Sequence, residues 1–476
     1  MFEILEKYRV GQTPPFQIIK GGRTYIQFTF HTLRQKKQSV RTAFSFQALS
    51  KNKKLYSEAL LCKAYLQNKF DTKLILKDLR FLKICGTIKY NLPMLTNIGE
   101  AMKKFLLVPD SFKGTLSSKQ ICKIIEERIK AHFTNANVIS IPVADGGEGS
   151  VECFLSAMDG ELITCDSVNP FFEKMNGFYG ILNNGKTAVI EMSACAGLPL
   201  VENRKDPLKA TTYGVGILIK DAILRGAEEI ILGLGGSATN DFGCGTAAAL
   251  GVLFYNENGE AFIPTGGSLH QVSRIDVSNI PPELSNIKIT LMCDVKNPVY
   301  GNNGAAFVYA PQKGADPDQV TLLDEGLKHI CQVVKRDLCK DVSSVVGGGA
   351  AGAMAGGMVA FFNASIRMGI DVVLETVGFD GLLEGADAVF TGEGKMDSQS
   401  LQGKVISGVA KHASAKGVPV IAVVGGVEGD ISEIYDLGVN SVFTINRLPE
   451  DFSVSRHKSE ENLRHTVDNV IRILKI

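Results

Sequence analysis

Four loops of the chain combine acidic, hydroxyl and glycine residues, and each follows a short apolar run. They are Asp110-Ser-Phe-Lys-Gly-Thr115, Asp145-Gly-Gly-Glu148, Leu234-Gly-Gly-Ser-Ala-Thr-Asn-Asp241 and Thr391-Gly-Glu-Gly-Lys-Met-Asp397. Glycine lets backbone approach a ligand closely, while the side chains offer donors for anions, ligands for cations and a base. Transfer of a phosphoryl group from ATP requires such anion donors, cation ligands and a base. One acid in such a loop more often caps a helix, so the prediction rests on the recurrence of the pattern.

A scaffold that gathers strand ends must position these loops, and the hydrophobic pattern predicts one. Buried parallel strands are expected at Phe105–Val108, Val138–Val143, Ala388–Phe390 and Val420–Val424. Amphipathic helices are expected after Ser117 or Ser118, over residues 404–415 and at the end of the chain. Alternation of strands and helices is typical of an α/β fold with a doubly wound parallel sheet.

The middle of the chain has a different pattern. Residues 165–200 predict antiparallel strands joined by a turn at Asn183-Asn184-Gly185, and strands at Ile230–Leu234 and Ile289–Cys293 follow later. We therefore expect one sheet domain from residues 102–164 and 384–476, with a mixed α/β domain of residues 165–383 inserted into it. The active site is expected in the cleft between the two.

The first 101 residues differ in composition from the rest. They carry 18 Lys and Arg against 6 Asp and Glu, a net of +12, whereas the remaining 375 residues have a net of −11. No nucleic-acid-binding signature accompanies the basic residues. The codons for Ile98-Gly-Glu-Ala-Met102 can form a purine-rich stretch just before an ATG. We interpret residues 1–101 as a basic N-terminal extension that is either disordered or the product of a mis-annotated start, with the enzyme beginning at Met102.

The cysteine and histidine spacing argues against metal and disulfide scaffolds. Ten cysteines occur without a CxxC pair and seven histidines without HExxH or HxxxH spacing. No apolar run approaches the length of about 20 residues that crosses a bilayer, and no secretory signal is recognisable. We expect a soluble, cytoplasmic protein.

Two familiar phosphate motifs have unsuitable contexts. Gly180-Ile-Leu-Asn-Asn-Gly-Lys-Thr187 matches the Walker A pattern, but a strand rather than a helix is expected after it, so a β-turn is predicted. Gly347-Gly-Gly-Ala-Ala-Gly352 matches GxGxxG, with Asp371 downstream for a ribose, and supports a rival hypothesis of a dinucleotide-dependent dehydrogenase. Its simpler interpretation is close packing of a glycine-rich helix.

Taken together, the motifs resemble those of the bacterial class I glycerate kinases. The resemblance covers about Met102 to Ile476 and rests on the Asp110, Asp145, Leu234 and Thr391 loops and on Pro311-Gln-Lys-Gly-Ala315. It implies a flavodoxin-like domain with an inserted α/β domain, and ATP-dependent phosphorylation of D-glycerate, usually to 2-phosphoglycerate. The sequence departs from the family where Asn240-Asp241 continues with Phe242-Gly243 instead of two glycines.

Roles follow from this chemistry. Lys113, Asp145 and Asp241 form the predicted catalytic set, in which the two acids are alternatives for the base that orients the acceptor hydroxyl. Asp294 and Glu393 are candidate Mg²⁺ ligands. The predicted substrate- and phosphate-binding residues are Asp110, Ser111, Gly235, Gly236, Ser237, Thr239, Asn240, Glu191, Ser193, Gly392 and Glu393.

The expected partners are D-glycerate, ATP and Mg²⁺, without nucleic acid or membrane. The sequence leaves open whether the protein is a homodimer, which side of the cleft holds ATP, and which hydroxyl is phosphorylated. Besides the dehydrogenase, a non-catalytic binding module that works through the basic arm remains an alternative.

Overall fold

The structure, a computed structural model, describes residues 102–144, 146–182, 185–397, 400 and 404–475, and the backbone of the strands before them. The chain divides into two compact units, Met1–Ala101 and Met102–Ile476. Described strands of the first unit are antiparallel: β1 Arg9–Gln12, β2 Phe16–Ile19, β3 Tyr25–Arg34 and β4 Val40–Leu49. The hypothesis of an N-terminal extension stays a prediction.

A five-stranded parallel sheet gathers strands from both ends of the second unit. It contains β5 Lys104–Pro109, β6 Asn137–Ser140, β16 Ala388–Gly392, β18 Val420–Val424 and β20 Ser441–Thr444. The order is β20-β18-β16-β5-β6, which is 2-1-3-4-5 when these strands are numbered along the chain. The buried parallel strands expected at Phe105–Val108, Ala388–Phe390 and Val420–Val424 are confirmed. The strand expected over Val138–Val143 is shorter and less buried than predicted, because β6 ends at Ser140 and lies at the edge of the sheet, where none of its four residues is buried.

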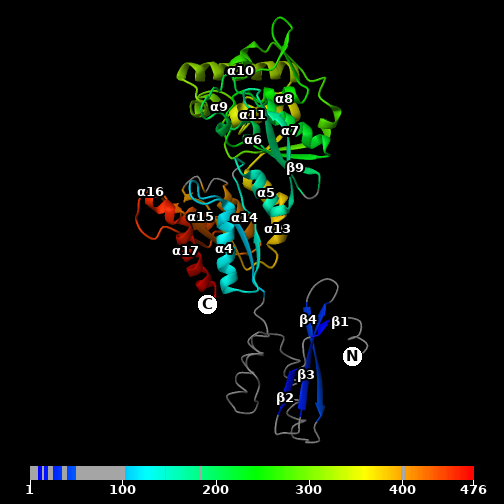
Figure 1. Cartoon of the computed structure of the whole chain (residues 1–476), viewed down its shortest axis with the longest axis vertical. Coiled ribbons are helices and arrows are strands. Elements are labelled where there is room, and N and C mark those ends of the chain that lie inside the picture. The colour runs from blue at the N-terminus through cyan, green and yellow to red at the C-terminus, as the bar shows by residue number, and fades with distance from the viewer. Residues whose placement is uncertain are drawn as a thin grey trace. The chain divides into compact units, whose positions relative to one another are not determined.

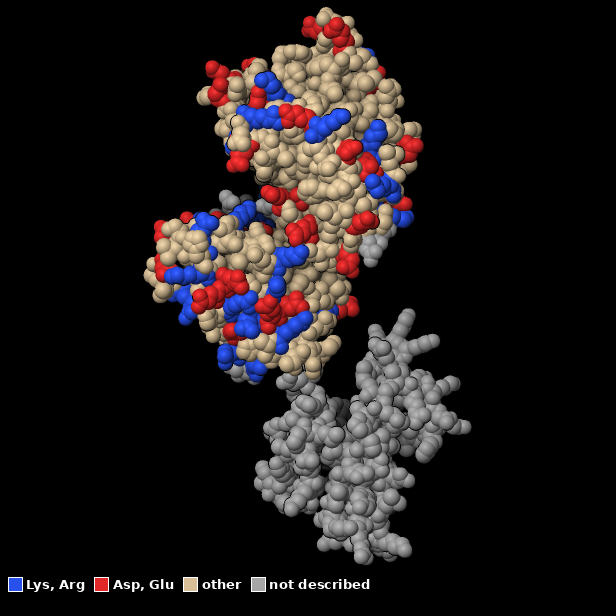
Figure 2. Space-filling model, viewed as in Figure 1, with Lys and Arg blue, Asp and Glu red and all other residues tan. Residues whose placement is uncertain are grey.

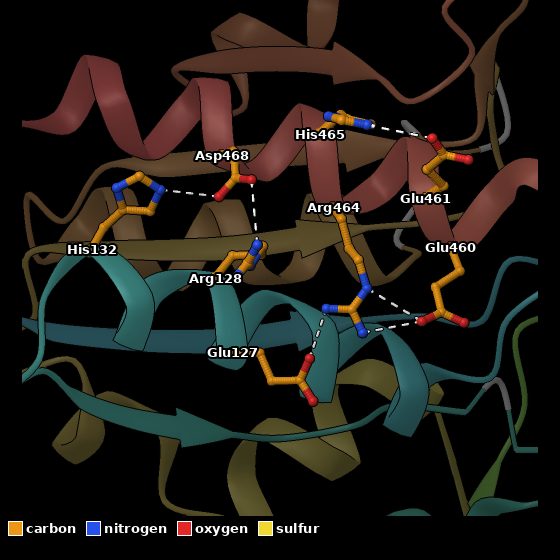
Figure 3. Close-up of polar contacts among 8 residues, drawn as sticks. All are labelled: Glu127, Arg128, His132, Glu460, Glu461, Arg464, His465 and Asp468. Atoms are coloured by element: carbon orange, nitrogen blue, oxygen red, sulfur yellow. Dashed lines mark hydrogen bonds and ion pairs between the residues drawn. The ribbon is translucent and has the colours of Figure 1, made fainter.

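Helices cover both faces of this sheet (Figure 1). Apolar side chains of α4 Ser118–His132 and α17 Ser459–Leu474 pack on one face, and those of α12 Gly369–Thr376, α13 Phe379–Leu382 and α14 Val405–Ala415 pack on the other. Ser117 caps α4 in a capping box with Gln120, as its sequence predicts. Polar contacts join α4 to α17 along their length (Figure 3), including Arg464 to Glu127 at 2.7 Å and His132 to Asp468 at 3.0 Å.

A second sheet of six strands is mixed. It contains β7 Gly160–Val168, β8 Lys174–Leu182, β9 Thr187–Glu191, β10 Glu229–Gly233, β14 Lys288–Met292 and β15 Ser365–Arg367, in the order β15-β14-β10-β9-β8-β7. Strands β7, β8 and β9 pair antiparallel, and the pairs from β9 to β15 are parallel. Strands β8 and β9 flank the Walker A match and pair antiparallel, so a strand rather than a helix follows it, as predicted; Asn183 and Asn184 of the predicted turn lie outside the described residues.

Further elements surround the six-stranded sheet and extend from the five-stranded one. They are α5 Ser150–Met158, α6 Ser193–Ala196, α7 Tyr213–Leu224, α8 Cys244–Ala249, β11 Leu253–Tyr255, β12 Ala261–Phe262, β13 Arg274–Asp276, α9 Ala305–Tyr309, α10 Pro317–Leu338, α11 Ala350–Phe362, β17 Lys395–Met396, β19 Gly426–Val427, α15 Glu433–Asp436 and α16 Phe452–Ser455. One hydrophobic cluster includes Leu106 and Val389 of the first sheet and Val189 and Ile231 of the second, so the two sheets share a core. Over the described residues, no helix is both long enough and apolar enough to cross a bilayer.

The glycine-rich stretch before and within α11 is used for close packing. A Cβ on Gly357 would lie 1.8 Å from the carbonyl oxygen of Phe242, and one on Gly352 would lie 2.0 Å from the carbonyl oxygen of Thr239. Gly352 also has a left-handed backbone with φ of +64°, which glycine adopts readily. The interpretation of the GxGxxG match as helix packing therefore fits the geometry.

Phe242 itself has a left-handed backbone, with φ of +56°, at the position where the family resemblance leads one to expect glycine. Such a conformation costs a residue with a Cβ about 1–2 kcal/mol. The ring is fully buried and meets Phe361 edge to face at 6.0 Å. Burial of a whole phenyl ring is worth about 2–3 kcal/mol, which offsets the strain.

We predict that Gly357→Ala destabilises the protein by at least about 2 kcal/mol, because the new methyl group has no space beside the Phe242 carbonyl. Gly381→Ala is the matched control, since Gly381 is exposed in α13 and a Cβ there meets nothing within 4 Å. Thermal unfolding of the two variants and the parent checks the prediction. Equal midpoints for all three proteins would contradict it.

Candidate active site

A cavity of about 1290 Å³ lies in Met102–Ile476 and is lined by loops from both sheets. Eight of the predicted site residues line it: Asp110, Ser111, Lys113, Gly235, Gly236, Ser237, Asp294 and Glu393. These residues are up to 283 positions apart in sequence, so the fold brings the distant loops together. Asp145 lies outside the described residues, although Gly147 and Glu148 of the same loop line the cavity.

One wall of the cavity is formed by the carboxyl ends of β5 and β16. The Asp110 backbone N–H donates to the Gly392 carbonyl at 2.8 Å, which ties the two loops together. The Asp110 carboxylate accepts the Ser111 N–H at 2.6 Å, and Lys113 follows in the same loop. Position 392 requires glycine, because a Cβ there would lie 1.9 Å from the carbonyl oxygen of Val423. Gly392 thus positions the wall through its backbone.

Glu393 is the most strongly perturbed acid that lines the cavity. Its side chain is 6% exposed, and its Oε1 has no hydrogen-bond partner among the described residues. The pKa of Glu393 is raised to about 7, mainly by burial and also by the nearby charges of Asp110 and Asp397, while a Ser400 hydrogen bond and Lys404 oppose the shift. A cation bound beside this group would restore its ionised form.

The opposite wall begins where β10 ends. The Gly235 N–H donates to the Gly146 carbonyl at 2.9 Å, so the loop after β6 lies directly against the loop after β10. Gly236 has a φ of +72°, which turns the chain before Ser237. Beyond β14, Asp294 accepts the N–H of Gly369 at 2.8 Å, the first residue of α12. One Asp294 oxygen therefore serves the helix N-terminus, as a capping acid does.

Asp241 does not reach the cavity. It is fully buried, and its carboxylate accepts four hydrogen bonds, from Thr212 N–H at 2.8 Å, Thr212 Oγ1 at 2.9 Å, Gly243 N–H at 3.1 Å and Gly245 N–H at 3.2 Å. Burial raises the pKa of Asp241, and these hydrogen bonds oppose the shift. This geometry does not support the predicted catalytic base at Asp241, because the carboxylate is buried and both of its oxygens already accept hydrogen bonds.

Like Gly392, four other predicted residues do not line the cavity: Glu191, Ser193, Thr239 and Asn240. Glu191 is 2% exposed and accepts the Val151 N–H at 2.7 Å and the Ser193 hydroxyl at 3.0 Å, so it joins β9 to the first turn of α5. Thr239 and Asn240 are fully buried below the Gly235–Ser237 turn. The proposed contacts of Glu191 and Ser193 with glycerate hydroxyls therefore lack support from this geometry.

Lys313 lines the cavity and was given no role from the sequence. Its side chain is 2% exposed, and its Nζ donates to Ser237 Oγ and to the Thr239 carbonyl, both at 2.7 Å. Burial lowers the pKa of Lys313 to about 7, and the charge of Asp241 opposes the shift. The sequence feature that could have indicated Lys313 is its position in Pro311-Gln-Lys-Gly-Ala315, but this segment lacks the acidic residues on which the prediction of the site rests.

Comparison with known proteins gives one consistent result. Residues 105–475 match the model of the glycerate kinase family. A glycerate kinase of Bacillus cereus is 43% identical over 374 residues, which cover 78% of this chain and 98% of the relative. A glycerate 2-kinase of Escherichia coli K12 is 40% identical over 78% of this chain and 95% of its own length. A crystal structure from Salmonella typhimurium LT2, assigned as glycerate kinase 2, superposes with a TM-score of 0.71 at 37% identity and covers 79% of this chain and 98% of its own.

We predict that Asp241→Asn lowers stability by on the order of 2 kcal/mol, because the new amide NH₂ faces backbone donors and leaves them without an acceptor. Turnover of the folded protein should fall less than tenfold. Thermal unfolding and kcat with ATP and glycerate check both statements. A loss of kcat of about 100-fold or more at unchanged stability would instead support a base at Asp241.

Glu393 should make stability depend on pH. Because its folded-state pKa of about 7 exceeds the ordinary value of 4.5, the folded protein holds this proton more tightly than the unfolded chain does. Its contribution to stability is thus lost as pH rises from 4.5 through 7. We expect Glu393→Gln to match the parent at pH 5 and to exceed it at pH 8 by on the order of 2 kcal/mol. Denaturant unfolding at both pH values checks this, with the exposed Glu161→Gln as control, and a difference independent of pH would contradict it.

Proposed function

The chain belongs to the glycerate kinase family, and we propose that its cavity is where the γ-phosphate of ATP passes to D-glycerate, giving 2-phosphoglycerate in preference to 3-phosphoglycerate. Membership of this family makes the protein a kinase, a phosphotransferase with an alcohol group as acceptor. One observation carries the proposal for the site: loops rich in glycine, acids and hydroxyls come from two sheets and line a single cavity. The glycerate 2-kinase among the relatives supports the 2-phosphoglycerate product.

We propose a flavodoxin-like domain of residues 102–164 and 384–476, with residues 165–383 as an inserted α/β domain. The strand order 2-1-3-4-5 of the five-stranded parallel sheet supports it, because flavodoxin-like sheets have this order. Ligands of such sheets bind beyond the carboxyl ends of the strands, where Asp110 and Glu393 lie. In this proposal, the cavity is the cleft between the two domains.

The first wall suits the polyphosphate of ATP. Lys113 and Ser111 lie in a loop between β5 and α4, and Lys395 and Lys404 line the same cavity. Lysine ammonium groups and hydroxyls stabilise the negative oxygens of a phosphoryl group in transfer. We therefore assign the nucleotide to the β5–β16 wall and the hydroxy acid to the β10 wall. This arrangement would hold the acceptor hydroxyl opposite the γ-phosphate.

The acids of the first wall also fit Mg²⁺. Within the part of the chain that the structure describes, Glu393 has a buried oxygen without a hydrogen-bond partner, and Asp110 and Asp397 lie close enough to raise its pKa. Among the described residues, no group of three or more acids, histidines or cysteines is arranged to hold an ion by itself. Mg²⁺ commonly takes only one or two protein carboxylates and completes its shell with phosphate oxygens and water. Glu393 and Asp110 are therefore the proposed ligands, with Asp294 a further candidate, and the ion would neutralise phosphate charge.

For the base, Asp145 remains the proposed residue. Its neighbours Gly147 and Glu148 line the cavity next to the Gly235–Ser237 turn, which supports a position near the acceptor hydroxyl. Lys113 is proposed to contact the transferred phosphoryl group from the opposite wall. Asp241 and Thr239 are assigned to support of the turn rather than to chemistry.

The expected partners are small molecules, without nucleic acid or membrane. Lysine, arginine and acidic side chains are interspersed over the visible face of Met102–Ile476 (Figure 2), which differs from the single-sign patch of a nucleic-acid surface. We also propose a cytoplasmic location, and a homodimer stays open. A start of the native enzyme at Met102 remains a hypothesis that an intact-mass measurement on native protein would test.

We predict that the full chain with MgATP and D-glycerate forms ADP and 2-phosphoglycerate, identified by ³¹P NMR against both phosphoglycerate standards. Omission of Mg²⁺ should abolish the product resonance, because the phosphate charge is then not neutralised. Formation of 3-phosphoglycerate would correct the regiochemistry alone. Consumption of ATP without either phosphoglycerate would contradict the assignment of the substrate.

A further inference from the structure

Lys313 is a buried cation fixed on the cavity wall by its own backbone. It ends a short 3₁₀ helix, Pro311–Lys313, and the next residue, Gly314, has a φ of +101°. A Cβ on Gly314 would lie 2.7 Å from Cβ of Lys205, so the backbone behind Lys313 is held close to a neighbouring segment. The ammonium group therefore has a defined position when it bonds to Ser237 and Thr239.

No acidic side chain among the described residues pairs with Lys313. The two acceptors of the Lys313 hydrogen bonds are uncharged. The carboxylate of Asp241 acts on Lys313 only through space, because the oxygens of Asp241 already accept four hydrogen bonds from Thr212, Gly243 and Gly245. A buried ammonium without a counter-charge is costly, and the cost is removed when an anion binds beside it. The cavity that Lys313 lines is the place from which such an anion can come.

The donors at this position match a carboxylate. The Nζ of Lys313 has three N–H donors, and two of them bond to Ser237 Oγ and the Thr239 carbonyl. Because the Ser237 hydroxyl accepts from Lys313, its own hydrogen is directed to another acceptor. A carboxylate can accept from the third N–H of Lys313 and from the Ser237 hydroxyl, one bond to each oxygen.

Two anions enter the proposed reaction, the carboxylate of the hydroxy acid and the phosphates of ATP. The acids Asp110 and Glu393, which suit a metal-bound polyphosphate, belong to the opposite β5–β16 wall. The Lys313 and Ser237 pair offers one positive charge, which balances one carboxylate. We propose that Lys313, with Ser237, binds the carboxylate of the hydroxy-acid substrate and so selects acids over neutral alcohols; this rests on the proposed function.

The test is Lys313→Met, which keeps most of the length of the side chain and removes its charge. We expect the KM for D-glycerate to rise roughly 100-fold and the KM for ATP to change less than threefold, because truncation of a buried charge pair acts on the ligand that it holds. Lys340→Met is the matched control. Lys340 also bonds to a carbonyl, that of Ala360, and to Asn363 Oδ1, but it does not line the cavity. Both KM values of this control should equal those of the parent.

Glyceramide has an amide in place of the carboxylate. It therefore distinguishes binding of the carboxylate by Lys313 from support of the loop structure by Lys313. The parent should use it poorly, and Lys313→Met should use it no worse than the parent does. A second variant, Ser237→Ala, keeps the ammonium and removes one donor, so the KM for D-glycerate should rise about tenfold even if Lys313→Met fails to fold.

The outcomes separate the two proposals. If the parent phosphorylates D-glycerate but Lys313→Met or Ser237→Ala keeps its KM within threefold, the carboxylate assignment is wrong and the proposed function stands. A rise in the KM for ATP instead would assign Lys313 to the nucleotide phosphates, and an equal loss with glyceramide would assign it to loop structure alone. Failure of the parent to phosphorylate D-glycerate would overturn the function and this inference together.

Discussion

The contact on which the site depends is between two backbones. The loop after β6 meets the loop after β10 where the Gly235 N–H bonds to the Gly146 carbonyl at 2.9 Å. A Cβ on Gly233 would lie 2.5 Å from the Gly146 oxygen, and one on Gly235 would lie 2.5 Å from Cα of Gly147. Any side chain here would separate the two sheets and widen the cavity. Glycine in these loops therefore lets the cavity walls lie close together, in addition to letting backbone approach a ligand.

Two buried charges of opposite sign hold the segment that carries the β10 turn. Lys313 bonds to Ser237 and Thr239, and Asp241 bonds to Thr212 and to the backbone of Gly243 and Gly245. The charge of Asp241 raises the pKa of Lys313 through space and so opposes the effect of burial, but the hydrogen bonds of both groups are made to backbone and hydroxyl groups. The segment is thus fixed on both sides of Asn240 without a direct ion pair. A direct pair would have cancelled the charge that Lys313 presents to the cavity.

The sequence predicted the strands, the helices and the loops that line the cavity, because these depend on local pattern and on the rule that parallel strands end at one edge of a sheet. It could not separate acids that face a ligand from acids that face backbone. Asp241 occurs in the same kind of loop as Asp110 and Glu393, and Glu191 ends strand β9, yet the carboxylates of Asp241 and Glu191 accept hydrogen bonds from backbone N–H groups inside the protein. Lys313 was missed for the converse reason. Its significance comes from burial without a counter-charge, which appears only once the chain is folded.

The pairing of β5 with β16 has a consequence for synthesis of the protein. Phe105 lies beside Ala388, and the Lys104 N–H bonds to the Asp387 carboxylate at 2.8 Å across 283 residues. Strand β5 thus waits for its neighbour β16, which the ribosome makes long after β6 and α4 are available. Pairings of such long sequence separation close slowly and leave hydrophobic strand edges exposed meanwhile. During much of its translation the nascent chain therefore holds only the β5 half of this cavity wall, with the edge of β5 exposed until β16 emerges.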